Sequence, residues 1–199
     1  MSHRLIPRPE LQERLLKAFL DHGYDQLNMV GLAKAVEMTR RSLYNYFTNK
    51  EEAFRYVVEH GNAKAVRLGI EAGRAKFSEG ADAIEIFTTI INVRYGEHRR
   101  RLMTSPHAVE INDQAFRRCR DIMVYSATSF QAQMASFIVE LQGAGRLKLQ
   151  PGVAPATLAQ LIADGARGTN QSLPPIESGD LEGRYRQMVA ALLYGVAGA

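Results

Sequence analysis

The stretch GYDQLNMVGLAKAVEMTRRSLYNYFTNKEEAF, residues 23–54, decides the fold of this chain of 199 residues. Asn28 and Thr39 are suitable helix N-caps, because a short polar side chain can accept a hydrogen bond from the free backbone N–H groups of the first turn. Apolar residues follow each of them at helical spacing, which predicts one short helix after Asn28 and another after Thr39, ending near Phe47. Two short helices joined by a tight turn are typical of a helix-turn-helix unit.

A longer helix is predicted before this unit. Pro9 suits a first helical turn, and Gly23 is a stop signal about four turns later. Between them, apolar residues recur at helical spacing: Leu11, Leu15, Ala18 and Phe19. The first quarter of the chain is therefore expected to form three helices with a common core.

The third predicted helix has an unusually polar surface. If Leu43 and Phe47 face the core, six residues are spread over the remaining surface: Arg40, Arg41, Ser42, Tyr44, Asn45 and Tyr46. Arginine can bond guanine with two hydrogen bonds, and asparagine can do so with adenine. A positive helix end near Thr39 also favours a phosphate. The pattern indicates a helix that reads DNA, although Tyr44 and Tyr46 could instead pack against neighbouring helices with their hydroxyls in water.

Composition and charge permit this interpretation without requiring it. The formal charge is +4, and most of the excess lies in residues 1–50, where eight basic residues face five acidic ones. Such a basic surface can bind phosphates or can simply be solvated. The hydrophobic content of 46% is ordinary for a soluble globular protein, and the one cysteine excludes an intramolecular disulfide. With no apolar run of ~20 residues and no secretory signal, we expect a cytoplasmic protein without a membrane partner.

Residues 23–54 resemble the DNA-binding segment of the TetR family of transcriptional regulators. The matching positions are Gly23, Tyr24, Leu32, Ala33, Thr39, Ser42, Leu43, Tyr44, Tyr46, Phe47, Lys50 and Glu51. One position departs from the family pattern: Glu37 stands in the turn where the family usually has glycine. A residue with a side chain is strained there if the turn needs a positive φ.

The resemblance implies a DNA contact set within this segment. Phosphate contacts are expected from Asn28, Thr39, Tyr44 and Lys50, and base or groove contacts from Arg40, Arg41, Ser42 and Asn45. Tyr46 could serve in either role. The stretch HRLIPRP resembles a flexible arm whose Arg4 or Arg8 could reach an adjacent minor groove.

The rest of the chain is predicted to be helical as well, so the fold class is all-α. We expect a DNA-binding domain over residues 1–49 and a helical domain over residues 50–199. A long helix is expected to start after Asn49, which is a further N-cap candidate, and a buried helix to follow the stretch SEGAD. Further helices are predicted from about Asp113 to Gln142, where Phe116 and other apolar residues recur at near-heptad spacing, and over residues 155–171 and 180–196.

The last two predicted helices are candidates for a dimer interface. In the TetR family, the corresponding helices pair with their copies in a four-helix arrangement. The implied interface residues are Leu158, Leu161, Ile162, Gly165, Tyr185, Met188 and Leu192. Packing within one chain is the alternative. Dimerisation would also double the footprint of a short recognition helix, on half-sites roughly 34 Å apart.

No pattern indicates catalysis, and we expect neither a cofactor nor a metal. The five histidines lack metal-ligand spacing, the cysteine has no CxxC partner, and no GxSxG, P-loop or GxGxxG motif occurs. Aromatic and flexible apolar side chains could instead wall a ligand cavity: Phe87, Ile91, Tyr95, Met123, Phe130 and Met134, with His107 beside them. The same residues could form a filled core.

These observations predict a homodimeric regulator that binds double-stranded DNA. The resemblance adds a small, largely apolar effector that releases a repressor from its palindromic operator. The alternative is a ligand-binding or scaffold α-helical bundle without affinity for DNA.

Overall fold

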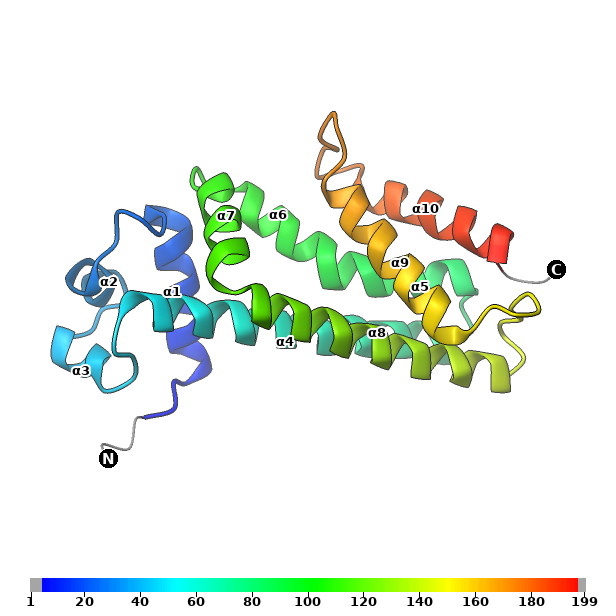
Figure 1. The fold of residues 1–199 in the computed structure, drawn as a ribbon, viewed down its shortest axis with the longest axis horizontal. Coiled ribbons are helices and arrows are strands. Elements are labelled where there is room, and N and C mark those ends of the chain that lie inside the picture. The colour runs from blue at the N-terminus through cyan, green and yellow to red at the C-terminus, as the bar shows by residue number, and fades with distance from the viewer. Residues whose placement is uncertain (1–4, 197–199) are drawn as a thin grey trace. The chain divides into compact units, whose positions relative to one another are not determined.

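The computed structural model describes residues 5–196, and these residues contain ten α-helices, one π-helical segment and no strand (Figure 1). The chain forms two compact units. The first comprises the residues up to 63 together with 101–124, and the second comprises 64–100 together with the residues from 125 onward. The units therefore divide the chain differently from the predicted boundary after residue 49, because residues 101–124 join the N-terminal helices.

The first unit is built on the predicted three-helix arrangement. Its helices are α1 (Pro9–His22), α2 (Met29–Ala35), α3 (Arg40–Tyr44), the start of α4 (Lys50–Ser78) and α7 (Ala108–Arg118). Three aromatic rings lie at the centre of its core, with the Phe54 centroid 5.0 Å from that of Phe19 and 4.9 Å from that of Tyr24. Leu43 of α3 is fully buried in the same core, so the short third helix is anchored by its apolar side.

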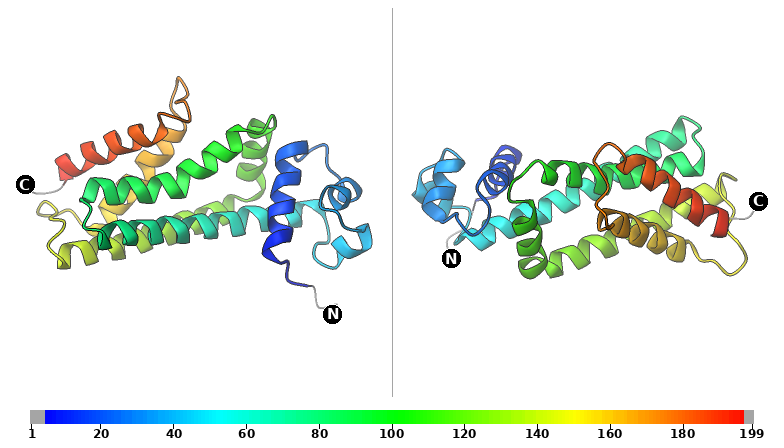
Figure 2. Two further views of the ribbon diagram at one scale, coloured as in Figure 1. Left: turned by 180° about the vertical axis from the view of Figure 1, so that it is seen from behind. Right: turned by 90° about the horizontal axis from the view of Figure 1, so that it is seen from above.

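The second unit is a helical bundle with its own apolar core. It contains the rest of α4, then α5 (Ala83–Ile91), the π-helical segment η1 (Asn92–Gly96), the first part of α6 (Glu97–Met103), most of α8 (Arg120–Gly143), α9 (Pro155–Asn170) and α10 (Leu181–Val196). Within this unit α10 packs against both α5 and α9, as the three views show (Figure 2).

One predicted helix is divided in two. The expected continuous helix from about Asp113 to Gln142 is broken at Cys119, which ends α7 and precedes α8. Neither glycine nor proline marks this break, so the sequence pattern could not reveal it. Phe116, which the near-heptad spacing grouped with residues beyond the break, lies on α7 and is exposed.

The turn after α2 explains the role of Glu37. This residue has φ 56° and is the non-glycine residue with a positive φ in the described part of the chain. Its N–H donates to Lys34 O at 3.1 Å, and the N–H of Met38 donates to Ala33 O at 2.9 Å. This pair of bonds is the Schellman termination, which normally uses glycine at the left-handed position. Glu37 therefore adopts the positive φ that the departure from the family pattern made questionable.

Candidate nucleic-acid interface

The N-termini of α2 and α3 are capped by the two predicted side chains. Asn28 Oδ1 accepts hydrogen bonds from the N–H groups of Val30 at 3.0 Å and Gly31 at 2.9 Å. Thr39 Oγ1 accepts from the N–H of Ser42 at 3.0 Å, and its hydroxyl lies 2.8 Å from the Ser42 hydroxyl. Both N-cap predictions are confirmed. These caps fix where each helix starts and orient both positive helix ends.

Helix α3 presents a polar face outward. Four of its predicted DNA-contacting residues are exposed and Ser42 is half-buried; the exposed residues are Arg40, Arg41, Tyr44 and Asn45. The Arg40 guanidinium lies 5.3 Å from the centre of the Tyr44 ring, and its Nη2 donates to the Tyr44 hydroxyl at 3.4 Å. Because this pair is exposed, both side chains can exchange the contact for one with an external partner.

Two of the predicted contact residues are committed to their own chain. Lys50 Nζ donates to Tyr24 O at 2.8 Å and lies 4.2 Å from the centre of the Tyr24 ring. Burial lowers the pKa of this ammonium group. The ammonium group that was expected to contact a phosphate is therefore bonded within the chain, where Lys50 fastens the start of α4 to the turn at Tyr24. Tyr46 is half-buried against the core beside Phe47, which matches the packing alternative.

The residues before α1 lie along the end of α3. The N–H of Leu5 donates to Asn45 O at 3.0 Å, and the Tyr56 hydroxyl donates to Pro7 O at 3.3 Å. Arg8 is exposed at the N-cap of α1, whereas Arg4 lies outside the described residues. The predicted arm is thus attached to the unit at least from Leu5 onward.

A polar network holds the turn between α1 and α2 against α7. Glu110 Oε1 accepts from the N–H of Asp25 at 2.6 Å, and Gln114 Nε2 donates to the Asp25 carboxylate at 3.1 Å. Gly23 has φ 73°, and a Cβ there would lie 2.4 Å from Glu110 Oε2. Glycine is favoured at this turn by its positive φ, and a side chain there would also displace the Glu110 carboxylate.

Sequence reasoning missed one residue beside the polar face. Val30, in the first turn of α2, is 57% exposed. An exposed β-branched side chain near a DNA-reading helix can contact a thymine methyl group or a sugar. The apolar pattern assigned Val30 neither to the core nor to the contact residues. The only sequence signal that places Val30 at a helix end is the N-cap at Asn28.

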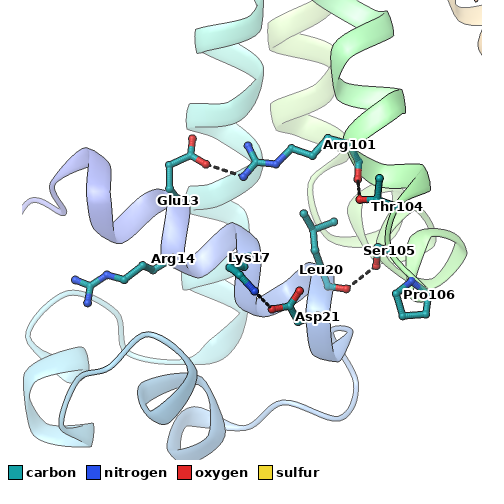
Figure 3. Close-up of a pocket in the computed structure, with 9 residues that line it drawn as sticks. All are labelled: Glu13, Arg14, Lys17, Leu20, Asp21, Arg101, Thr104, Ser105 and Pro106. Atoms are coloured by element: carbon teal, nitrogen blue, oxygen red, sulfur yellow. Dashed lines mark hydrogen bonds and ion pairs between the residues drawn. The ribbon is translucent and has the colours of Figure 1, made fainter. Parts of the chain in front are cut away.

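The first unit also has an open hollow of about 450 Å³ between α1 and the end of α6 (Figure 3). Arg101 Nη2 donates to Glu13 Oε2 at 2.7 Å, and Ser105 Oγ donates to Leu20 O at 2.5 Å. Lys17 is bonded to Asp21 on the same wall. Two of its three cations, Lys17 and Arg101, already bond carboxylates, and Arg14 donates to Val36 O, so the hollow has no single sign of charge that would select a ligand.

The predicted ligand residues do not form one group. Five belong to the second unit and pack in its core: Phe87, Ile91, Phe130 and Met134 are fully buried, and Tyr95 is half-buried. His107 and Met123 belong to the first unit. His107 Nδ1 instead lies 3.3 Å from Glu110 Oε2. Met123 is half-buried near the start of α8, the helix that also carries Phe130 and Met134.

The predicted interface residues likewise separate into two sets. Leu158, Ile162 and Tyr185 are fully buried within the chain, so their assignment to a dimer interface is corrected. They occupy the sides of α9 and α10 that face the core of their own unit. Leu161 is 37% exposed. The remaining three, Gly165, Met188 and Leu192, are half-buried, with Met188 packed directly against Gly165.

Other kinds of site are not indicated. No cluster of three or more His, Cys, Asp or Glu side chains that could hold a metal occurs among residues 5–196. Burial raises the pKa of the Cys119 thiol to about 11, which leaves it protonated and poorly nucleophilic at neutral pH. In the same range, no helix is long and apolar enough to span a bilayer.

Comparisons with known proteins agree with this geometry. Residues 14–57 match the family model of the bacterial regulatory proteins, tetR family. No curated protein matches the chain. Solved structures do: a putative TetR-family transcriptional regulator from Mesorhizobium loti has 18% identity and a TM-score of 0.67, with 95% of this chain and 96% of that chain covered.

Two further solved structures match most of the chain. SmeT, the repressor of the Stenotrophomonas maltophilia multidrug efflux pump SmeDEF, has 14% identity and a TM-score of 0.64, and the match covers 97% of this chain and 91% of that chain. FadR from Bacillus subtilis, in complex with stearoyl-CoA, has 16% identity and a TM-score of 0.65, with 94% and 97% covered. Residues 14–57 thus carry the sequence signature of the tetR family, and the fold is that of TetR-family transcriptional regulators.

Proposed function

We propose that this protein is a DNA-binding transcriptional regulator of the TetR type that acts in the cytoplasm. The observation that carries the proposal is α3 itself: its apolar side is anchored by the fully buried Leu43, while its polar side is exposed. A capped helix with a rigid position and an outward polar face can enter a major groove without rearranging the protein. The catalytic alternatives lack any comparable arrangement of groups in the described residues.

The exposed residues divide into two roles. Arg40, Arg41, Ser42 and Asn45 are proposed to contact base edges, because their donors and acceptors match the major-groove patterns of guanine and adenine. Asn28, Thr39 and Tyr44 are proposed to contact phosphates, since they lie at or beside the helix N-termini. Lys50 is proposed to support this face indirectly through Tyr24 rather than to bind DNA.

The protein is proposed to act as a homodimer on a palindromic operator. One α3 of five helical residues contacts only a few base pairs, and a second copy supplies the remaining affinity. The outer sides of α9 and α10 are the proposed interface, through Leu161, Met188 and Leu192 together with the exposed Tyr194. The buried residues Leu158, Ile162 and Tyr185 support this surface from within.

We propose that the protein represses transcription, and that a small, largely apolar effector bound in the second unit releases this repression. The structural likeness to SmeT and to FadR with stearoyl-CoA supports this proposal, as does the concentration of aromatic side chains around Phe130. An effector can release DNA only if it binds the DNA-competent and incompetent conformations with different affinities.

Footprinting on the DNA upstream of the protein's own coding sequence tests the proposal. We expect protection of a sequence with two-fold symmetry, and loss of protection when Arg40→Ala and Tyr44→Ala are combined. Circular dichroism and analytical ultracentrifugation of the double variant should show an unchanged fold and dimer. A helical bundle without DNA affinity, the alternative function, would protect no symmetric site at any protein concentration.

A further inference from the structure

The side chain of Arg14 ties the middle of α1 to the end of α2. Its Nη1 donates to Val36 O at 2.8 Å, and it extends away from Lys17 and Asp21, which pair with each other along α1 (Figure 3). Val36 is the C-cap residue of α2 and is fully buried. A cation at this position supplies a donor to a carbonyl oxygen at the helix end, where the helix has no N–H to offer, and its charge is favourable at the negative end of the helix.

The turn after α2 benefits from such support because its backbone is strained. Glu37 has φ 56°, and a residue with a Cβ is disfavoured in this left-handed conformation by about tenfold in population. Two backbone bonds hold the turn, from the N–H of Glu37 to Lys34 O at 3.1 Å and from the N–H of Met38 to Ala33 O at 2.9 Å. The bond from Arg14 is a third contact on the same turn, and it comes from a different helix.

The direction of α3 depends on this turn. Helix α3 begins at Arg40, three residues after Glu37, and Thr39 between them is its N-cap. A different backbone angle at Glu37 would therefore change how the polar face of α3 is presented, although the buried Leu43 still attaches the helix to the core. One hydrogen bond from a charged donor is comparable in free energy with the strain of a positive φ, so the bond from Arg14 is large enough to decide which form of the turn is populated.

We propose that Arg14 is a positioning residue for DNA reading: by bonding Val36 O, it keeps the turn in its strained form and α3 in the orientation that enters the groove. This inference rests on the proposed function, which it extends to a residue of α1 outside the predicted contact set. The apparent affinity of a protein for its ligand falls in proportion to the fraction of the protein that is competent to bind. Loss of the Arg14 bond should therefore weaken DNA binding although no contact with DNA is removed.

Paired methionine substitutions on α1 test the inference. Methionine keeps an unbranched apolar stem but has no hydrogen-bond donor, so Arg14→Met removes the bond and leaves much of the packing. Lys17→Met is the matched control, because it removes an equal charge from an exposed side chain of α1 that pairs with Asp21 on its own helix. In fluorescence anisotropy on the footprinted duplex, Arg14→Met should bind about tenfold more weakly than the unaltered protein, whereas Lys17→Met should change the affinity by less than about threefold.

A second substitution separates positioning from a direct contact with DNA. Glycine adopts a positive φ without a Cβ clash, so Glu37→Gly removes the strain that the Arg14 bond opposes. The protein with both Glu37→Gly and Arg14→Met should therefore bind within about threefold of the protein with Glu37→Gly alone. Arg14→Met should also leave unchanged the slope of the logarithm of affinity against the logarithm of salt concentration, whereas loss of a phosphate contact would reduce that slope by about one.

The same role is measurable without DNA. The N–H of Met38 closes the turn, so its hydrogen exchange reports how often the turn opens. NMR, with correction for the intrinsic exchange rates, should show this amide exchanging about tenfold faster in Arg14→Met and at an unchanged rate in Lys17→Met. Adding Glu37→Gly to Arg14→Met should slow the exchange again.

Three outcomes would overturn the inference: Arg14→Met binds the duplex as tightly as Lys17→Met does, Glu37→Gly fails to compensate for Arg14→Met, or the Met38 amide is equally protected in both methionine variants. The result is separable from the regulator proposal. A protein that protects no operator contradicts the regulatory function, while exchange at Met38 still decides whether Arg14 holds the turn. A protein that binds DNA equally well after loss of Arg14 contradicts only the positioning role.

Discussion

The helix α3 and the segment η1 are both five residues long, and they use their arginines in opposite ways. In α3, Arg40 and Arg41 are exposed, while Leu43 is buried. In η1, Arg94 is buried, and glycine at position 96 allows Tyr185 to pack closely. An exposed polar face suits a large, hydrated and anionic partner such as DNA. The buried guanidinium is instead held within its own chain, where it donates to Ser126 Oγ.

The comparison separates two kinds of setting for an arginine. The face of α3 depends on local sequence signals, namely an N-cap, a helical period and polar residues on one side. The surroundings of Arg94 depend on residues distant in sequence, such as Gly69, Ser126 and Arg167, which only the folded unit brings together. Substitutions in the two regions should therefore affect binding and stability differently.

The largest expected effect tests whether α3 truly has a buried side. Leu43→Ala should lower the free energy of unfolding by about 2–5 kcal/mol, because it opens a cavity in a fully buried part of the core. Denaturant unfolding of the variant measures this. Arg41→Ala, on the exposed side, should change stability by no more than about 0.5 kcal/mol. Similar losses for both variants would contradict the orientation of α3.

The next effect tests the close packing of η1. Gly96→Ala should destabilise the protein by about 1–3 kcal/mol, because the new methyl group would overlap Asn92 Oδ1 and approach Tyr185. Gly61→Ala is the control within α4, since nothing lies within 4 Å of its added Cβ. That variant should gain roughly 0.5–1 kcal/mol from helix propensity. Thermal unfolding of both variants measures the two changes in stability. A gain for Gly96→Ala, or a loss for Gly61→Ala, would contradict this account of the packing.

A smaller effect sharpens the account of the turn before α3. Glu37→Gly should raise the free energy of unfolding by about 1 kcal/mol, because glycine adopts the φ of 56° without a Cβ clash. Glu37→Ala removes the same charge but retains a Cβ, so it should bring no comparable gain. If alanine and glycine stabilised the protein equally, the charge and not the backbone angle would be the cause.

The smallest expected effect concerns Arg74, an arginine of the second unit that is exposed, unlike Arg94. The hydrogen bonds from Arg74 hold the pKa of Glu140 below its ordinary value of 4.5. Glu140→Gln should cost less than about 1 kcal/mol at pH 7, since solvent screens this exposed pair. A depressed carboxyl pKa stabilises the fold above the unfolded pKa, so the difference between the two proteins should be lost as the pH falls below the lowered pKa of Glu140 in the folded protein. A difference that persisted at pH 2 would exclude this ion pair as its source.

Local signals explain which features the sequence could predict. Asn28 and Thr39 were identified as N-caps because the cap requires a particular side chain followed by a helical period. The last two helices were also predicted within a residue or two, since PPIE and neighbouring polar residues interrupt the apolar period. The polar face of α3 followed from the same reasoning once Leu43 was assigned to the core.

Long-range contacts explain the features that the sequence could not predict. Lys50 matched a phosphate-binding position, yet its ammonium group bonds Tyr24 O, a contact that no local pattern shows. The break at Cys119 has no glycine or proline, and the resulting change of direction exposes Phe116. Leu158 and Ile162 were assigned to an interface because an apolar helix face does not reveal whether its partner is the same chain or another copy.

The most direct test of the central claim is the affinity of the protein for its footprinted duplex, measured by fluorescence anisotropy over a range of salt concentrations. We predict tight binding whose logarithm falls linearly with the logarithm of salt concentration, as contacts to several phosphates require. The double substitution Arg40→Ala with Tyr44→Ala should weaken binding by about 100-fold or more while leaving the fold unchanged. Affinity that is independent of salt, or unaffected by the double substitution, would contradict the assignment of α3 as the DNA-reading helix.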